Sequence, residues 1–238
     1  MILPNFALRS ALVVALVTAL PANAAPTLVS QRSTPELSLP AQLQLADTTV
    51  ERYQLLPKDE DFVYDFSKNP DLPFANRKSF PALTGYGTSF SLSALPACSM
   101  SFVHLHPRAT ELFALTSGRV LTEMVPEGNI LDSDKKQRVI RTELHPGMMT
   151  IFPAGSFHTQ VNPDCEPANF TAALTAEDFG ISLVADQTFS FTDDVIARTF
   201  GQSISGKDID RVKDAIPGAT LIRVEECLSK CGIQKRQV

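Results

Sequence analysis

The chain has 238 residues, of which 44% are apolar and 20% are charged, and its formal net charge is −5. This length suits one domain of roughly 200 residues or two small ones, and the apolar fraction excludes a disordered chain. The acidic balance, without a run of Lys and Arg, argues against nucleic acid as a partner, because neutralising phosphates requires clustered cations. The 17 prolines favour a turn-rich β protein over a helical bundle.

The first 24 residues are typical of a secretory signal peptide. Arg9 precedes an apolar run at 11–20, which ends at Pro21 before the small-residue segment 22–24. This order predicts cleavage after Ala24, and a run of about ten residues is too short to span a bilayer. We therefore expect a protein secreted to the extracellular space or the cell wall, with no membrane anchor.

Residues 25–79 are polar, contain prolines and show weak periodicity, so they predict an extended N-terminal arm that packs on a core. From residue 80 onward the pattern changes to short alternating segments separated by turn residues, which predicts a β core over 80–190. Several short strands at this spacing indicate a sandwich or a barrel. The strand-like runs after the first, which lies near 86–92, are 101–106, 112–125, 138–144, 149–152, 158–161 and 170–176.

Helical patterns occur only near the C-terminus. Residues 193–200 have an acidic start and a glycine stop, 207–216 place apolar residues on one face, and 223–230 form a third short candidate. We expect C-terminal helices within 191–232, followed by a charged tail at 233–238.

Four cysteines follow the predicted signal peptide: Cys98, Cys165, Cys227 and Cys231. A secreted protein permits disulfides, and four cysteines allow three connectivities. Cys227 and Cys231 lie four apart on a predicted helix, so a local pair is one hypothesis, with Cys98 then paired to Cys165; the sequence leaves the connectivity open. A thiolate metal site is the alternative, but a four-cysteine zinc site normally comes as two close pairs.

Three further residues have weaker signals. Asn169 begins the chain's one N-x-S/T sequon, which makes it the candidate for a single glycan. His145 lies in a His-Pro-Gly turn and is expected to be exposed. Arg108 is expected to form a structural ion pair rather than to hold a substrate.

The remaining histidines form a pattern that points to a metal. His104 and His106 are two apart in a strand context, which places both imidazoles on one face. Pro107 then turns the chain, so that Glu111 on the next strand folds back toward them. His158 follows a Pro-x-Gly turn into another strand. A single histidine is more often a core or surface residue, but three imidazoles and one carboxylate converging in a barrel would make a four-ligand site.

These residues also carry a family resemblance. Residues 104–111, His-Leu-His-Pro-Arg-Ala-Thr-Glu, followed by Gly118, resemble the first cupin motif in its germin form. Residues 147–162 match the second cupin motif, G-x5-P-x-G-x2-H-x3-N, at every spacing. The chain resembles a secreted germin-like protein, and is most similar to the spherulin-like members of fungi and slime moulds. The resemblance implies an all-β fold: a single cupin jelly-roll β-barrel with an extended N-terminal arm and a short C-terminal helical cap.

The resemblance further implies that His104, His106, Glu111 and His158 bind one divalent metal, usually Mn²⁺ in germins. Four such ligands leave one or two open positions on a six-coordinate ion for a small-molecule substrate. Spacing alone does not separate Mn from Fe, Zn, Ni or Cu. The resemblance also implies a homo-oligomer, a trimer or a hexamer.

The sequence departs from the family pattern at three positions. Cys98 replaces the glycine that usually opens the first motif. Ser91 and Ser101 replace the asparagines that oxalate oxidases carry thirteen and three positions before the first histidine. A serine hydroxyl is shorter and lacks the amide donor, so oxalate would be held less well.

Two hypotheses follow. The first is a metal-dependent oxidoreductase that acts on superoxide or, as a lesser expectation, on oxalate. The second is a non-enzymatic cell-wall, spore-coat or encystment protein whose metal site serves structure. The sequence does not decide between them.

Overall fold

The computed structural model describes residues 36–68, 73–217 and 220–233. The predicted signal peptide at 1–24, the beginning of the predicted arm and all but the first residue of the predicted tail lie outside these ranges. Within the described part of the chain, no helix combines the length and the apolar character that a membrane crossing requires.

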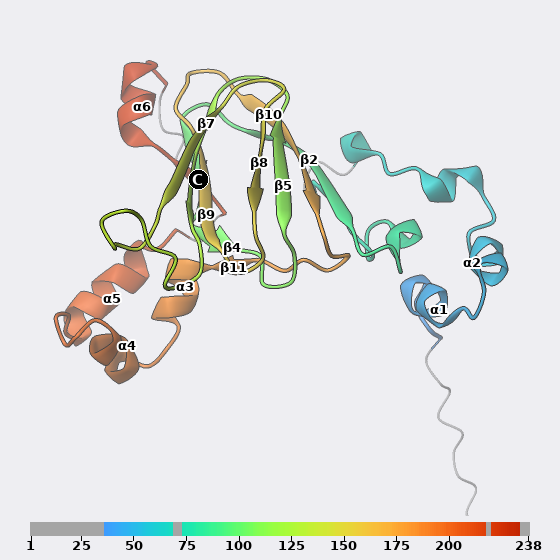
Figure 1. The fold of residues 1–238 in the computed structure, drawn as a ribbon, viewed down its shortest axis with the longest axis horizontal. Helices are drawn as coiled ribbons and strands as arrows, with labels where there is room; N and C mark the ends of the chain where they lie inside the picture. The colour runs from blue at the N-terminus through green and yellow to red at the C-terminus, as the bar shows by residue number, and fades with distance from the viewer. Residues whose placement is uncertain (1–35, 69–72, 218–219, 234–238) are drawn as a thin grey trace, which may run out of the picture. The chain divides into compact units, whose positions relative to one another are not determined.

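Five antiparallel strands make the first sheet, in the spatial order β1-β2-β10-β5-β8 (Figure 1). Their bounds are β1 (Phe74–Ala75), β2 (Ser89–Leu95), β5 (Glu111–Leu115), β8 (Met149–Phe152) and β10 (Ala168–Leu174). Buried and exposed residues alternate along β5, as the sequence pattern predicts for a half-buried strand. Glu111 is the first residue of β5, opposite Phe152 and Leu174, so its carboxylate lies at one end of this sheet.

The second sheet has seven antiparallel strands arranged around β9 (Phe157–Asn162). On one side β9 pairs with β6 (Val120–Val125), which pairs with β7 (Ile140–Leu144). On the other side it pairs with β4 (His104–Leu105) and β3 (Ser99–Ser101). Two short strands, β11 (Ser182–Leu183) and β12 (Leu221–Arg223), extend this side by pairing with β4 and β3. His104 and His158 are direct cross-strand neighbours.

Inward-facing residues of both sheets form one hydrophobic core. Its members are Leu95, Phe113, Leu115, Val120, Met124, Leu144, Phe152, Ala168 and Ala172. Two antiparallel sheets packed around one core confirm the predicted single cupin jelly-roll.

The predicted run 112–125 is divided in the structure into β5 and β6. Gly118 lies in the turn between them with a φ of +81°, and a Cβ there would lie 2.8 Å from the Cα of Ala168. Only glycine fits both the backbone conformation and this close approach.

The described residues between 36 and 83 contain short helices, so this part of the chain is not the extended arm that its weak periodicity predicts. The helices are α1 (Leu39–Leu45), α2 (Thr49–Leu55), η1 (Asp59–Phe62), η2 (Phe66–Lys68) and η3 (Pro81–Leu83). Thr48 and Glu51 form a reciprocal capping box at the start of α2. Leu43, Leu56 and Ala82 form a small buried cluster, so this segment has apolar packing of its own.

The three predicted C-terminal helices are present. They are α4 (Asp193–Thr199), α5 (Gly206–Ala215) and α6 (Glu225–Lys230). The third begins later than the pattern indicates, because residues 221–223 form β12 instead. A further short helix, α3 (Val184–Phe189), follows β11 at the end of the predicted β core.

All four cysteines form disulfides, but the hypothesis of a local pair is wrong. Cys98 pairs with Cys227 and Cys165 pairs with Cys231. The reason is the docking of α6: the backbone N–H of Val224 donates to the carbonyl of Cys98 at 2.8 Å, which brings one face of α6 over the two earlier cysteines. Cys227 and Cys231 lie one helical turn apart on that face, so each reaches a different partner.

Cys98 keeps the glycine-like backbone of the position that it occupies. Its φ is +52°, in the left-handed region that costs a non-glycine residue about 1–2 kcal/mol. The residue is fully buried and held by its bond to Cys227. The bond to Cys227 therefore holds Cys98 in a backbone conformation that a non-glycine residue rarely adopts.

Candidate metal centre

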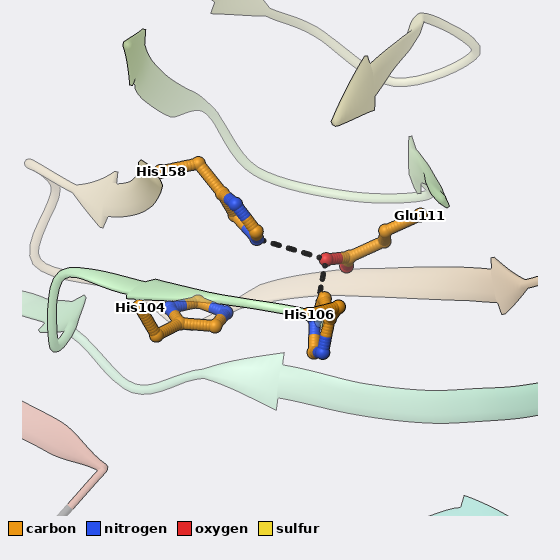
Figure 2. Close-up of side chains that lie close together, drawn as sticks. All are labelled: His104, His106, Glu111 and His158. Carbon is orange, nitrogen blue, oxygen red and sulfur yellow. Dashed lines mark hydrogen bonds and ion pairs between the residues drawn. The ribbon is translucent and has the colours of Figure 1, made fainter. Parts of the chain in front are cut away.

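The four residues singled out by the sequence lie together between the ends of the two sheets (Figure 2). His104 is on β4, His106 follows directly after it, Glu111 begins β5 and His158 is on β9. One ligand atom from each side chain lies within 4.8 Å of all the others. All four residues are between 2% and 7% exposed. Four buried side chains with ligand atoms this close together could hold a metal ion.

Backbone carbonyls fix the orientation of all three imidazoles. The acceptors are the carbonyls of Phe102, Gly180 and Ser156, at 2.7, 2.7 and 2.9 Å from Nδ1 of His104, His106 and His158 respectively. Because a carbonyl only accepts, each Nδ1 carries the hydrogen, and in a neutral ring the lone pair is then on Nε2. This is the arrangement that metal-binding histidines use to hold the ring and its tautomer.

The Glu111 carboxylate faces two of these rings. Its Oε2 lies 3.1 Å from Nε2 of His106 and 3.2 Å from Nε2 of His158. Burial favours the neutral acid, but hydrogen bonds from His106 and His158 outweigh it and lower the pKa of Glu111 to about 2. Burial, with the nearby His158, lowers the pKa of His104 to about 4. At neutral pH Glu111 is therefore ionised and His104 is neutral.

Glu111 can accept from His106 and His158 only if both rings are doubly protonated, since each Nδ1 already donates to a carbonyl. A divalent cation among the four side chains would take the place of those extra protons. Two ligand atoms about 2.1 Å from one ion and at right angles lie about 3 Å apart, which fits the two measured separations. The donor set therefore fits a divalent metal.

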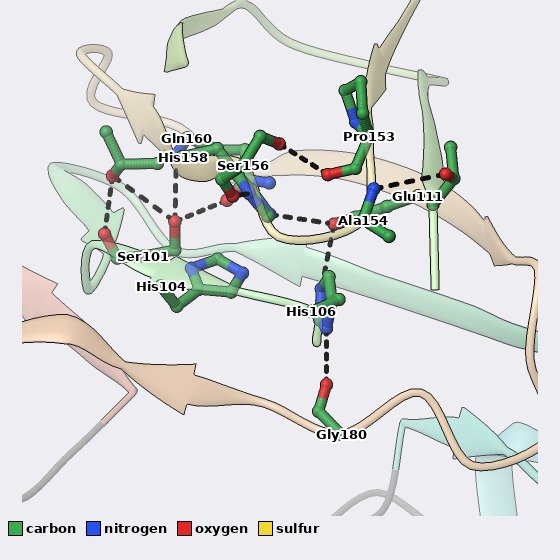
Figure 3. A network of polar contacts seen from close by, with 12 residues as sticks. Ser101, His104, His106, Glu111, Pro153, Ala154, Ser156, His158, Gln160 and Gly180 are labelled. Carbon is green, nitrogen blue, oxygen red and sulfur yellow. Dashed lines mark hydrogen bonds and ion pairs between the residues drawn. The ribbon is translucent and has the colours of Figure 1, made fainter. Parts of the chain in front are cut away.

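Backbone N–H groups of the turn at 153–155, in the second motif, donate hydrogen bonds to the first motif; Figure 3 shows the contact of Ala154. The Gly155 N–H donates to the carbonyl of His106 at 2.9 Å, and the Ala154 N–H donates to Oγ1 of Thr110 at 3.2 Å. The Phe152 ring stacks on the imidazole of His158 with a centroid distance of 4.2 Å. The turn that precedes β9 thus fixes His158 and His106 relative to each other.

A cavity of about 350 Å³ adjoins His104, His106 and Glu111. Ser91 and Ser101, the two positions that differ from oxalate oxidases, both line it. Ser101 Oγ makes a hydrogen bond with the side chain of Gln160 and accepts from the Gln160 backbone N–H at 2.9 Å (Figure 3). The sequence prediction missed Gln160, although its position two residues after His158 places it on the same strand face.

The carbonyl that orients His106 was also missed. Gly180 lies after β10, and its neighbour Phe179 contacts the His106 ring edge to face at a centroid distance of 5.2 Å. A backbone carbonyl has no signature in sequence, so only the fold identifies it.

The other candidates lie outside the cluster. Arg108 is exposed and pairs with Asp178 at 3.0 Å, as the structural interpretation predicts. His145 is exposed and lies 3.3 Å from Glu143. Asn169 is an exposed residue of β10 whose side-chain amide donates to Ser117 Oγ at 2.6 Å. Its glycosylation stays a prediction.

Sequence comparisons with known proteins point to the same family. The sequence profile of the cupin family matches residues 68–207. Spherulin-1A of Physarum polycephalum is 34% identical over 218 residues, covering 86% of this chain and 82% of the relative. Germin-like protein subfamily 1 member 17 of Arabidopsis thaliana is 29% identical over 143 residues, covering 58% and 60%.

Among solved structures, an oxalate oxidase in complex with the substrate analogue glycolate matches with a TM-score of 0.57. The identity is 19%, and the match covers 68% of this chain and 83% of that structure. At this identity the match supports the shared fold. The sequence matches to the cupin profile and to Spherulin-1A cover most of the chain and include the four buried residues.

Proposed function

The chain belongs to the cupin family, and from that membership we propose that it binds one divalent metal, Mn²⁺, through His104, His106, Glu111 and His158. The observation that carries the proposal is the convergence of three imidazoles, each oriented by a backbone carbonyl, and the buried Glu111 carboxylate, with ligand atoms within 4.8 Å of one another. Imidazole and carboxylate ligands suit a divalent transition metal, and thiolates, which would favour softer metals, are absent from the set. The resemblance to germins supports Mn²⁺ among these metals.

We propose further that the site is that of a small-molecule redox enzyme. When bound, the metal would supply a centre that cycles between two oxidation states, with open positions toward the cavity. The chain's own residues keep the ligand set fixed while this happens. The three carbonyl contacts hold the imidazoles, and the stacked Phe152 ring limits the rotation of His158.

Superoxide is the substrate that fits the site best. In its dismutation one superoxide is oxidised to dioxygen, and a second takes up that electron and two protons to give hydrogen peroxide. This reaction needs no amide donors in the pocket, which agrees with serine at positions 91 and 101. Oxalate oxidation is the lesser expectation, since the Ser101 hydroxyl is already engaged by Gln160.

The test is superoxide consumption by Mn-loaded protein, normalised to bound metal. We expect a rate per Mn well above that of free Mn²⁺ in the same buffer. The His106→Ala variant should lose both the metal and this rate. His145→Ala is the matched control, because it removes a histidine that is exposed and outside the cluster. A fully loaded protein with no rate above free Mn²⁺ would overturn the redox proposal and leave the metal site standing.

We also propose that the protein is secreted and assembles as a homo-oligomer. The two disulfides and the predicted signal peptide support secretion. For assembly, the outer face of the first sheet carries exposed apolar residues on β2, β5 and β8, namely Phe90, Leu92, Leu112, Met149 and Ile151. Such a face suits a second copy of the chain. Light scattering on the purified protein tests this, and a monomer at micromolar concentration would contradict it.

The disulfides and the apolar outer face also favour a second candidate function, a non-enzymatic component of a cell wall, spore coat or cyst. A disulfide-stabilised chain with an apolar outer face suits a matrix, and the metal would then hold the barrel ends together. Stoichiometric Mn²⁺ without turnover, and retention of the protein in the wall fraction, would support this reading over the enzyme.

A further inference from the structure

The cavity beside the four-residue cluster is larger than superoxide or oxalate needs. Its volume of about 350 Å³ lies within the 300–1,000 Å³ range of pockets that hold larger organic ligands. We infer that it binds a monocarboxylate with an apolar body, whose carboxylate faces the cluster. This rests on the proposed function, because the carboxylate would take an open position of the bound metal.

The walls of the cavity are mainly apolar. Phe113, Phe170 and Leu174 line it from the first sheet. Further apolar lining residues come from the segment after β10 and from β12, namely Phe179, Ile181, Leu183 and Leu221. Aromatic and aliphatic walls around one polar end favour a ligand of the same pattern, since burying its apolar body removes that surface from water.

The charge of the site selects a monoanion. Among the described residues, no Lys or Arg lines the cavity. A divalent cation held by the Glu111 carboxylate and three neutral imidazoles would leave one net positive charge, which a single ligand carboxylate would neutralise. A second carboxylate held away from the cation would lie between apolar walls without an opposite charge, and burying such a group is costly.

One polar group in the wall has no partner of its own. Ser91 is 1% exposed, lies on the inner face of β2, and its Oγ makes no hydrogen bond within the described part of the chain. A buried hydroxyl left in this state is unfavourable. Because Ser91 lines the cavity together with His104 and Glu111, its hydroxyl is placed to donate to an oxygen of the bound ligand.

The experiment compares three probes on Mn-loaded protein: acetate, phenylacetate and 4-carboxyphenylacetate. Binding is measured by the paramagnetic broadening of probe proton signals by Mn²⁺, with Zn-loaded protein as the diamagnetic reference. We expect phenylacetate to bind at least about tenfold more tightly than acetate, since its ring leaves water. The second carboxylate of 4-carboxyphenylacetate should cancel most of that gain.

Ser91→Ala should weaken phenylacetate binding by about threefold to tenfold, the range of one hydrogen bond. Thr84→Val is the matched control, because Thr84 Oγ1 is also buried without a partner but does not line the cavity. Metal content is measured on each sample, so that a folding or loading defect is recognised.

Phenylacetate binding no tighter than acetate, or equal binding of the doubly charged probe, would overturn the inference. If Mn²⁺ is retained in that case, the proposed metal site stands. A protein that binds no Mn²⁺ at all would overturn both.

Discussion

The two ends of strand β9 bury polar side chains in different ways. At one end Asn162 is fully buried, and its side-chain amide donates to the carbonyls of Leu95, Pro96 and Glu166 at 2.8–3.1 Å. Its Oδ1 accepts from the Asp164 N–H at 3.0 Å. At the other end His158 is equally buried, but its Nε2 faces the carboxylate of Glu111 and the other imidazoles.

The difference separates a structural polar group from a binding one. Every hydrogen-bonding atom of the Asn162 side chain has a protein partner, so this end is complete without a ligand. At the His158 end, the acceptor atoms of neutral imidazoles and of the Glu111 carboxylate converge on one another, and only added protons or a cation would satisfy them. Burial alone does not indicate function. What does is the direction of the lone pairs.

Covalent bonds reinforce the same contrast. Both disulfides lie near the Asn162 end, where Cys98 and Cys165 are close in sequence to Ser99, the register partner of Asn162, and to Asp164. No disulfide reaches the four-residue cluster. If the contrast holds, the two ends of β9 can be perturbed independently.

The largest expected effect comes from removing the Cys98–Cys227 bond with the double variant Cys98→Ala/Cys227→Ala. Because the Cys165–Cys231 bond stays in place, the removed bond closes an effective loop of about 70 residues, so the free energy of unfolding should fall by about 4 kcal/mol in urea titration. The corresponding variant of Cys165 and Cys231, with a separation of 66, should lose about 4 kcal/mol.

Metal content should be unchanged in both cysteine variants, because the bonds stabilise the other end of β9. Peptide mapping of the unreduced wild-type protein provides the direct check of connectivity. A Cys98–Cys165 peptide would contradict the structural pairing.

The next effect is that of Asn162→Ala. The variant leaves several buried backbone groups without their partner, so the free energy of unfolding should fall by about 3 kcal/mol, while Mn²⁺ binding per folded chain is retained. Asn169→Ala, tested in unglycosylated protein, is the control: that side chain is exposed and should cost less than about 0.5 kcal/mol. If Asn162→Ala lost the metal without losing stability, the structural role assigned to the Asn162 end of β9 would be wrong.

The smallest effect is the pH dependence of the metal-free protein. His104 has a pKa of about 4 in the folded state against 6.5 in a free chain, so between these values the unfolded state binds the extra proton. Stability should therefore fall as the pH drops from 6.5 to 4, by an amount on the order of 2 kcal/mol. Glu111, with a folded pKa of about 2 against 4.5, extends the loss to lower pH in the same direction.

Thermal unfolding of the metal-free protein across pH 4–7 measures this, with His104→Gln for comparison. In His104→Gln, the plot of stability against pH should be flatter between pH 6.5 and 4. In Asn162→Ala, stability should be lower at every pH while the slope of that plot is unchanged. An unchanged slope in His104→Gln would refute the role given to His104.

The sequence predicts the four-residue cluster because short, local sequence patterns determine where its side chains point. The spacing of His104, His106 and Glu111 around one turn, and the Pro-x-Gly turn before His158, determine which face each side chain takes. The period-2 alternation of the strands likewise predicts a sandwich or a barrel, and the resemblance to the two cupin motifs implies the barrel. These features depend on a few neighbouring residues and on general strand geometry.

What the sequence could not predict depends on long-range docking. The disulfide pairing follows from where α6 packs, which no local pattern specifies. The carbonyls of Phe102 and Gly180 have no residue signature, and the cavity emerges only when the two sheets and the segment after β10 come together. The Thr48–Glu51 capping box, by contrast, was visible in the sequence and identifies α2 in retrospect.

The most direct test of the metal centre is the metal content of secreted, untagged protein grown with Mn²⁺ present, measured by mass spectrometry beside the variant His104→Ala/His158→Ala. We predict about one Mn per chain in the wild type and almost none in the double variant, which loses two of the four ligands. A wild-type content no higher than that of the variant would contradict the proposal that the four converging side chains form a metal site.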